Sequence, residues 1–347
     1  MPALRPIRIL LADDSAVVRL SMRRLLEAEP DFVVVGAVEN GLRAVEETQR
    51  LRPDVLILDI EMPVMGGLEA MGRLAAARSG AAVIVSSTLT RRNAEISMRA
   101  LELGAADCMA KPGAMGGETD PDSYAQAIKA RIRDLVSRQR TGKPQAADIE
   151  ARRWPPVGAA RPQVVVIGAS TGGPQALLTL LPEIATVPVP ILVTQHMPPM
   201  FTTVLAEHIA RACKMPCGEA RDQAAVTPGI HIAPGGHHML VVAANGHIRF
   251  AVTQDPPENY CRPAVDPMLR SAVGVYGART LAVILTGMGS DGLQGCRQIA
   301  AAGGTVIAQD EASSAVWGMP RAVAAAGLCS AVLPLPRLGA AVRALFS

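Results

Sequence analysis

The sequence predicts two α/β units in one chain, each built around a parallel sheet. Short apolar runs of strand length alternate with amphipathic stretches of helix length on both sides of a glycine- and proline-rich middle segment. The 347 residues suffice for two domains of ordinary size. A hydrophobic fraction of 49% supplies ample cores, and a charged fraction of 19% argues against wholesale disorder.

We expect residues 1–140 to form a doubly wound unit with a five-stranded parallel sheet, because five apolar runs are each followed by a helix-like stretch. The last helix should cover residues 121–140. Its Ile128, Ile132 and Leu135 recur at the spacing of one helix face. The five runs are Ile7–Ala12, Phe32–Ala37, Val55–Leu58, Ala82–Val85 and Ala106–Ala110.

Residues 141–163 are rich in glycine and proline and are predicted to be a linker. Residues 164–347 then begin a second series of buried strands, which predicts a mostly parallel sheet. An Asn-Gly pair at Asn245 and Gly246 indicates an antiparallel hairpin in addition. The predicted strands are Val164–Ile167, Ile191–Gln195, Leu281–Leu285 and Thr305–Ala308, with Leu240–Ala243 and Ile248–Val252 in the hairpin.

Charge and hydropathy exclude several classes of protein. The net charge of +3 is too small for a nucleic-acid-binding surface. We expect a cytoplasmic protein without membrane insertion, because the chain has no apolar run of 18 residues and no signal-peptide core at its start. The six cysteines are scattered, and even Cys213 and Cys217 lack a second pair nearby, so they are expected to be reduced thiols rather than zinc ligands.

Polar side chains stand at the ends of the strands predicted in the N-terminal unit. Asp13 and Asp14 follow the first strand and Asp59 follows the third, and these strand ends are neighbours in a doubly wound sheet. Three carboxylates there predict a Mg²⁺ site, which would screen an incoming phosphoryl group from Asp59. Ser86 and Lys111 end the next two strands and could bind phosphoryl oxygens. The alternative, that the first two acids only cap the next helix, explains none of the other groups.

The strand Val164–Ile167 leads into the turn Gly168–Gly173, which contains Ser170 within a G-x-S-x-G pattern. Such a strand-to-helix turn exposes a serine oxygen above the sheet and directs helix N–H groups at any anion bound there. The serine is therefore either a nucleophile or part of a phosphate-binding loop. As a nucleophile it needs a base, because a serine hydroxyl is unreactive at neutral pH.

His196 is the best candidate for that base among the six histidines. It directly follows the strand Ile191–Gln195, at the same sheet edge as Ser170, whereas the others lie in a helix, a strand, turns or the hairpin. Asp291 follows another buried strand and is the candidate that orients the histidine. Its alternative role is to cap the helix that starts near Gly292.

Backbone N–H groups near Thr171 and Met288 are the candidates for an oxyanion hole. The chain order Ser, His, Asp differs from the orders of the chymotrypsin-like, subtilisin-like and α/β-hydrolase enzymes. The G-x-S-x-G pattern therefore does not predict an α/β-hydrolase fold.

The N-terminal unit resembles the phosphoacceptor receiver domain of two-component response regulators, by the pattern described above and by Pro112 after the lysine. The resemblance implies that Asp59 accepts phosphate from a histidine kinase. Two positions depart from the family. Gly66 stands in the turn Met62–Gly67 where an acid is usual, and Cys108 stands where receivers carry a tyrosine or phenylalanine switch. We expect phosphorylation to survive these departures, which concern the relay of the signal to a partner surface.

The C-terminal unit resembles the catalytic domain of the chemotaxis protein-glutamate methylesterases, the CheB family. The resemblance implies an esterase that removes methyl groups from glutamate methyl esters of chemoreceptors and also deamidates receptor glutamines. In it Ser170 is the nucleophile, His196 the base and Asp291 its orienter, with no cofactor. Cys261 and Ala264 stand where the family more often has histidine and serine. The matching segments are Gly168–Pro174, Gln195–Pro198, Ile232–Met239, Arg262–Asp266, Thr286–Gly292, Ala308–Glu311 and Trp317–Pro320.

The resemblance to both families also implies partners and a mode of regulation. The partners are methylated chemoreceptors and a chemotaxis histidine kinase. The unphosphorylated receiver covers the catalytic opening, so that removing residues 1–140 raises basal activity. Two other readings stay open from the residues alone. For a nucleotide-binding module, this sequence lacks the expected G-x-G-x-x-G spacing and the acid that should follow it. A DNA-binding regulator would need a shorter, more basic second unit.

Overall fold

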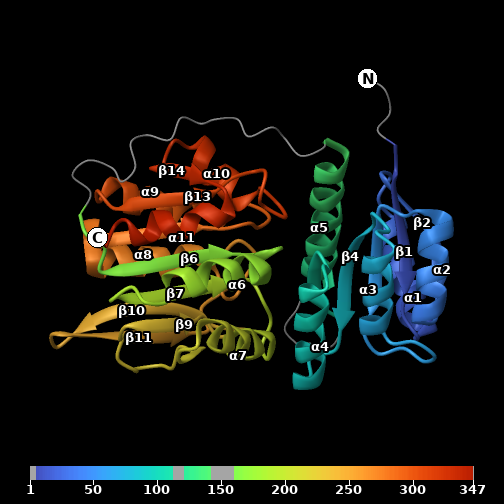
Figure 1. The fold of residues 1–347 in the computed structure, drawn as a ribbon, viewed down its shortest axis with the longest axis horizontal. Helices are drawn as coiled ribbons and strands as arrows, with labels where there is room; N and C mark the ends of the chain where they lie inside the picture. The colour runs from blue at the N-terminus through green and yellow to red at the C-terminus, as the bar shows by residue number, and fades with distance from the viewer. Residues whose placement is uncertain (1–4, 112–120, 142–159, 347) are drawn as a thin grey trace. The chain divides into compact units, whose positions relative to one another are not determined.

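The computed structural model describes residues 5–111, 121–141 and 160–346 (Figure 1). The chain divides into two compact units, Met1–Gly142 and Lys143–Ser347. Most of the linker predicted at residues 141–163 lies outside the described residues, as does Pro112.

The first unit is the doubly wound α/β fold that the sequence predicts. Its five strands are all parallel and lie in the order β2-β1-β3-β4-β5. The strands are β1 (Ile7–Ala12), β2 (Phe32–Val38), β3 (Val55–Asp59), β4 (Ala82–Ser87) and β5 (Asp107–Ala110), and the helices are α1 (Ala16–Glu27), α2 (Gly41–Leu51), α3 (Gly67–Ala76), α4 (Arg91–Glu102) and α5 (Pro121–Thr141).

Strand order in this unit places the switch point between β1 and β3. The chain leaves β1 toward β2 on one side and returns to β3 on the other, so a crevice opens at the carboxyl ends of β1 and β3. Helix α1 starts beside this crevice. Its capping side chain is Ser15, whose Oγ accepts a hydrogen bond from the Val18 N–H at 3.4 Å. The acids at residues 13 and 14 are therefore not the side-chain cap of α1.

The second unit contains a seven-stranded parallel sheet and a separate two-stranded antiparallel hairpin. The sheet order is β14-β13-β12-β6-β7-β9-β8, and every described pair is parallel. Its strands are β6 (Val164–Ala169), β7 (Pro190–Gln195), β8 (Cys217–Glu219), β9 (Gly229–Ile232), β12 (Thr280–Ile284), β13 (Thr305–Gln309) and β14 (Ala331–Leu333), and the hairpin pairs β10 (His238–Ala244) with β11 (His247–Thr253).

Helices connect these strands and cover the sheet. Helix α6 packs with α7 and α11, while α8 packs with α9, β6 and β10. Because the chain goes from β6 to β7 and later returns beside β6 as β12, a second switch point lies between β6 and β12. The helices are α6 (Gly173–Ile184), α7 (Phe201–Cys213), α8 (Val265–Tyr276), α9 (Leu293–Ala301), α10 (Met319–Ala325) and α11 (Leu335–Arg343), with a short 3₁₀ turn at Gly277–Arg279.

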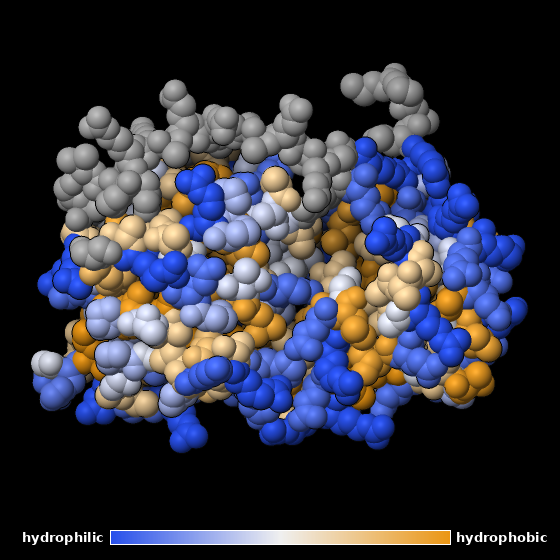
Figure 2. Space-filling view, viewed as in Figure 1, coloured by the Kyte–Doolittle hydropathy of each residue, from blue (hydrophilic) through white to orange (hydrophobic). Residues whose placement is uncertain are grey.

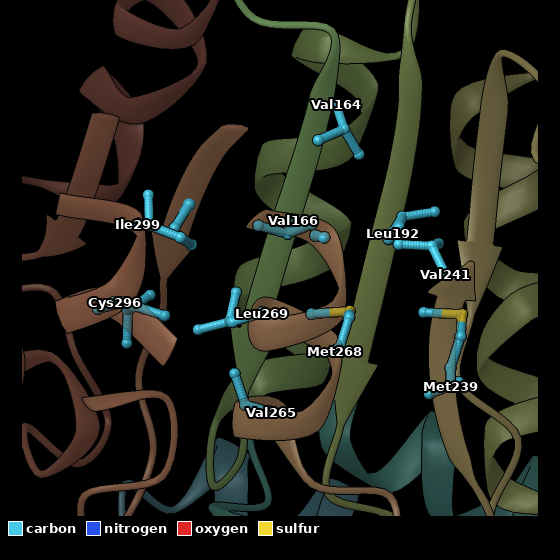
Figure 3. Packing of buried hydrophobic residues seen from close by; sticks show 14 of the residues in the cluster. Val164, Val166, Leu192, Met239, Val241, Val265, Met268, Leu269, Cys296 and Ile299 are labelled. Atoms are coloured by element: carbon cyan, nitrogen blue, oxygen red, sulfur yellow. The ribbon is translucent and has the colours of Figure 1, made fainter. Parts of the chain in front are cut away.

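Helix α8 is held against the sheet by a buried hydrophobic cluster (Figure 3). Its Val265, Met268 and Leu269 are fully buried with side chains of β6, such as Val166. Each such side chain contributes about 1.5–3 kcal/mol by burial. A methyl group on Gly168 of β6 would lie 2.5 Å from Val265 Cγ1, so the close approach of α8 requires glycine there. This packing fixes the N-terminus of α8 near the carboxyl ends of the strands.

The surface of each unit mixes hydrophilic and hydrophobic residues on the face drawn in Figure 2. Exposed apolar or aromatic side chains include Val17, Val64 and Tyr260. Among the described residues, no helix combines the length and the apolar character needed to span a bilayer.

Candidate active site and acidic pocket

The carboxylates predicted in the N-terminal unit meet at the switch point. Single ligand atoms of Asp13, Asp14 and Asp59 all lie within 4.8 Å of one another. Lys111 follows β5 and places its Nζ 2.7 Å from Asp59 Oδ2 and 2.9 Å from Asp13 Oδ2. Ser86 on β4 stands opposite Asp59 in the parallel register. The five residues selected from the sequence are thus neighbours in space.

Burial governs the charge of this pocket. The Asp59 side chain is 2% exposed, and this burial raises its pKa from 3.8 to about 6. The Lys111 ammonium opposes the rise, and the nearby Asp13 adds to it. One lysine thus faces three acids. A hard cation with oxygen ligands would balance the remaining charge, so the donor set fits Mg²⁺.

The two departures from the receiver pattern have different surroundings. Gly66 precedes α3 with φ of −73°, a value open to any residue. The next residue, Gly67, is constrained: a methyl group there would fall 2.2 Å from the Asp59 carbonyl oxygen. Cys108 is buried in β5, and burial raises the pKa of its thiol. This side chain is therefore held as a neutral thiol within the sheet.

In the second unit, Ser170 and His196 stand at the ends of adjacent strands. β6 and β7 pair in register up to Ala169 and Gln195, so the two candidates are the next residues on each strand. The His196 N–H donates to the Ala169 carbonyl at 3.1 Å. The Ser170 N–H donates to the Thr286 carbonyl, at 3.0 Å, in the loop that follows β12. The turn, the base and the third loop therefore meet at one sheet edge.

His196 and Asp291 form a buried pair. The distance between Nε2 and Oδ2 is 2.7 Å, and the two side chains are 7% and 2% exposed. Three backbone N–H groups also donate to this carboxylate: those of Val265, Asp266 and Gly292, at 2.7, 3.0 and 2.9 Å. Both oxygens of the Asp291 carboxylate therefore accept hydrogen bonds from the backbone.

These contacts correct the alternative role considered for Asp291. The sequence allows two roles for Asp291, an orienting acid or a cap of the helix near Gly292. Helix α9 has Gly292 as its N-cap without a side-chain cap, whereas the carboxylate binds the first N–H groups of α8. The residue therefore holds the N-terminus of a different helix while it also binds His196. An acid at a helix N-terminus is electrostatically favoured.

The pKa values of His196 and Asp291 are shifted in opposite directions. Burial would raise the pKa of Asp291, but the hydrogen bond from His196 and the backbone N–H groups lower it below 3.8. Burial would lower the pKa of His196, but Cys261 and Asp291 raise it from 6.5 to about 10. Both groups therefore favour their charged forms.

Two contacts of this pair are absent from the sequence prediction. Cys261 Sγ lies 3.4 Å from His196 Nδ1, and Asn259 Nδ2 donates to Asp291 Oδ1 at 2.9 Å. Within the described residues the hydrogen-bond partner of Nδ1 is this thiol rather than the Ser170 hydroxyl. The only sequence signal was the departure from the family at Cys261. Nothing in the pattern indicated that Asn259 reaches the acid.

The residues selected for the oxyanion hole lie in two loops joined at the site. Thr171 is buried just before α6, and its carbonyl accepts a hydrogen bond from Thr286 Oγ1 at 2.8 Å. Met288 is two residues further along the loop that contains Thr286. Between them Gly287 packs so closely that a methyl group there would lie 2.8 Å from Ser170 Cβ. The loops adjoin Ser170, and the oxyanion role remains a prediction.

Fold and site together define a two-unit protein. One unit carries a receiver-type acidic pocket, and the other joins a serine turn to a buried His-Asp pair. Comparison with known families agrees with this class: the response regulator receiver domain matches residues 9–137, and the CheB methylesterase family matches residues 165–342. The chain belongs to the CheB methylesterase family.

Relatives and a solved structure support this assignment over most of the chain. A protein-glutamate methylesterase/protein-glutamine glutaminase of Rhodopseudomonas palustris (strain BisB5) is 47% identical, with 99% of this chain and 94% of the relative covered. One with the same name from Azospirillum brasilense is 48% identical, with 97% and 92% covered. The crystal structure of the Thermotoga maritima CheB methylesterase catalytic domain is 41% identical, with a TM-score of 0.52, and covers 54% of this chain and 100% of that one. This membership favours a hydrolase over the nucleotide-binding and DNA-binding alternatives.

Proposed function

We propose that Ser170, His196 and Asp291 carry out the protein-glutamate methylesterase and protein-glutamine glutaminase activity of this chain. The observation that carries the proposal is the buried 2.7 Å contact between His196 Nε2 and Asp291 Oδ2, one strand end away from Ser170. A base held by a buried carboxylate beside an otherwise unreactive serine is the arrangement that acyl transfer requires.

In this proposal the two nitrogens of the base have different roles. Nε2 is committed to Asp291, so Nδ1 must accept the proton of Ser170 as its oxygen attacks the ester or amide carbonyl. Methanol or ammonia leaves, and water then hydrolyses the acyl-enzyme. Backbone N–H groups at Thr171 and Met288 would bind the oxyanion. The contact between Cys261 Sγ and His196 Nδ1 must break before the serine proton can reach that nitrogen.

The receiver pocket supplies the regulation in this proposal. Asp59 accepts the phosphoryl group, while Lys111 and Ser86 bind its oxygens. Asp13, Asp14 and Asp59 would hold Mg²⁺, which supplies charge neutralisation when bound. The domains in this proposal are residues 1–140, a linker at 141–163 and the catalytic residues 164–347. The substrates would be methylated chemoreceptors, and the phosphate would come from a chemotaxis histidine kinase.

The test is a methanol-release assay on methylated receptor membranes. Ser170→Ala should lose roughly 10³–10⁶ in kcat, because the triad acts as a unit. Ser290→Ala is the matched control, since Ser290 is exposed in the neighbouring loop and is expected to keep wild-type activity. Near-wild-type release by Ser170→Ala would refute the proposed nucleophile.

A further inference from the structure

A tight turn places two side chains on the His-Asp pair. In the segment Glu258–Cys261 the end residues exchange backbone hydrogen bonds of 3.2 and 2.8 Å. The two central residues, Asn259 and Tyr260, have φ of 51° and 61°, the left-handed region that a type I′ turn requires. A tyrosine rarely adopts this conformation. The turn directs Asn259 to Asp291 and Cys261 to His196, while Tyr260 is exposed.

The imidazole of His196 therefore has a partner on each nitrogen. Asp291 is 2.7 Å from Nε2 and the Cys261 sulfur is 3.4 Å from Nδ1, within hydrogen-bond range for sulfur. If both nitrogens carry hydrogens, each N–H meets an anionic acceptor, carboxylate on one side and thiolate on the other. A thiol beside a protonated histidine is the arrangement that activates cysteine nucleophiles.

We propose that Cys261 and His196 form a thiolate–imidazolium pair in the resting protein. The pair makes Cys261 a nucleophilic thiol that soft electrophiles modify, and it keeps His196 from accepting the Ser170 proton. The thiol chemistry stands without the proposed function, whereas its consequence for hydrolysis rests on that function.

The surrounding charges are consistent with this pair. Asp291 faces His196 directly, and Asp266 lies behind it, joined through Asn259. The Arg270 guanidinium is bonded to Glu258 and also feels the charges of Asp266 and Asp291, which raise its pKa. Burial raises the pKa of each of the other thiols, which keeps them neutral; these are Cys108, Cys213, Cys217, Cys296 and Cys329. Cys261 is half-buried at the edge of an exposed turn, so small reagents can reach it.

The test is alkylation of the full-length protein by iodoacetamide, followed for each cysteine by peptide mass spectrometry. The thiolate sulfur attacks the reagent's CH₂ carbon, a C–S bond forms, the C–I bond breaks and iodide leaves. At pH 6.5 we expect Cys261 to react at least about tenfold faster than the half-buried Cys213. Its rate should change little between pH 6.5 and 9. A rate that climbs about tenfold per pH unit, as for an ordinary thiol of pKa about 8.5, overturns the proposal.

Variants locate the cause of the reactivity. His196→Gln should slow Cys261 alkylation at pH 6.5 at least about tenfold, because the imidazolium is removed. An unchanged rate in a folded variant, checked by circular dichroism, overturns the proposal. If this variant does not fold, the wild-type pH profile alone decides.

Hydrolysis gives a second readout. Cys261→Ala should shift the acidic limb of the kcat/KM profile to lower pH by one unit or more, since the anion that stabilises protonated His196 is lost. Cys261→Ser is the sterically matched control and should shift it likewise, because an alcohol stays protonated. An unmoved limb in both overturns the effect on the base. Normal Cys261 reactivity in a protein without hydrolase activity would instead refute the proposed function and leave the thiolate intact.

Discussion

Asp266 and Asp291 bind the N-terminus of each other's helix. Asp266, in the first turn of α8, accepts a hydrogen bond from the Gly295 N–H of α9 at 2.7 Å. Asp291, just before α9, accepts one from the Asp266 N–H at 3.0 Å. Asn259 donates to both carboxylates, at 3.2 and 2.9 Å. The acid that orients His196 is thus part of the packing between two helices, so its position is fixed by the fold.

This exchange predicts the result of Asp291→Asn. Both oxygens of Asp291 accept backbone N–H bonds, so either orientation of the amide sets an NH₂ group against a backbone donor. We expect a loss of about 10⁴ in kcat from the misdirected base. We also expect about 1–3 kcal/mol of lost stability from the unsatisfied donors. Methanol release and urea denaturation measure the two effects.

The control for that prediction is Asp266→Asn, which disturbs the same helix contact without touching His196. Its stability should fall by a similar amount, and its kcat should fall far less. Equal losses of kcat in the two variants would show that Asp291 acts only through the packing of α8 and α9.

Gly287→Ala tests how closely the loop after β12 holds the nucleophile. A methyl group at residue 287 would lie 2.5 Å from Met319 Sδ and 2.8 Å from Ser170 Cβ, so the serine must move. A displacement of about 1 Å can cost about 10²-fold in rate, and we expect a kcat loss of that order. Single-turnover methanol release measures the chemical step.

Gly274→Ala is the matched control for this substitution. Gly274 lies in α8 with nothing within 4 Å of the added methyl group. There alanine should keep full activity and stabilise the helix by about 0.5–1 kcal/mol. Full activity of Gly287→Ala would mean that the two loops yield without moving the serine.

The sequence predicted both sheets because buried strands of a parallel sheet read as continuous apolar runs. β1 begins and ends at the predicted residues, Ile7–Ala12. Two strands of the first unit extend beyond their apolar runs into polar residues. β3 extends to Asp59 and β4 to Ser87, one and two residues past the apolar runs, because ladder hydrogen bonds continue through polar side chains.

The site was predictable where residues lie in the stretches that follow buried strands. Ser170 and His196 do so on neighbouring strands, and strand order brings them together. Asn259 and Cys261 could not be found this way. Their position depends on a turn with two left-handed residues, and no glycine there announces it. The tertiary hydrogen bonds of the turn hold a conformation that local preference disfavours.

Mg²⁺ binding should strengthen with pH in the acidic range. The pKa of Asp59 is raised to about 6, so protons compete with the cation below that pH. We expect the Mg²⁺ affinity to rise about fivefold between pH 5 and pH 6, about tenfold between pH 5 and pH 7, and to level off above pH 7. Isothermal titration calorimetry at a series of pH values measures it.

The raised pKa of Asp59 also predicts how the stability of the metal-free protein depends on pH. A carboxyl with a raised pKa contributes stability below pH 3.8 that is lost as the pH rises through about 6. Asp59→Asn should therefore be more stable than wild type at pH 8, by about 1–3 kcal/mol, and gain nothing near pH 3.5. It should also lose the pH dependence of Mg²⁺ affinity. A constant stability difference across this range would show that Asp59 does not titrate with a raised pKa.

Regulation by the receiver predicts opposite effects of a phosphodonor and of a blocked phosphoacceptor. A small acyl phosphate with Mg²⁺ should increase methanol release by the full-length protein, and Asp59→Asn should keep the basal rate without responding. Removing residues 1–140 should raise the basal rate if the unphosphorylated receiver restrains the catalytic residues, as the resemblance to the family implies. Ser290→Ala, in which the phosphoacceptor is intact, should respond as wild type does. If the shortened chain is no faster than the unphosphorylated full-length protein, the receiver acts by activation and not by restraint. A response that persists in Asp59→Asn would instead require a different phosphoacceptor.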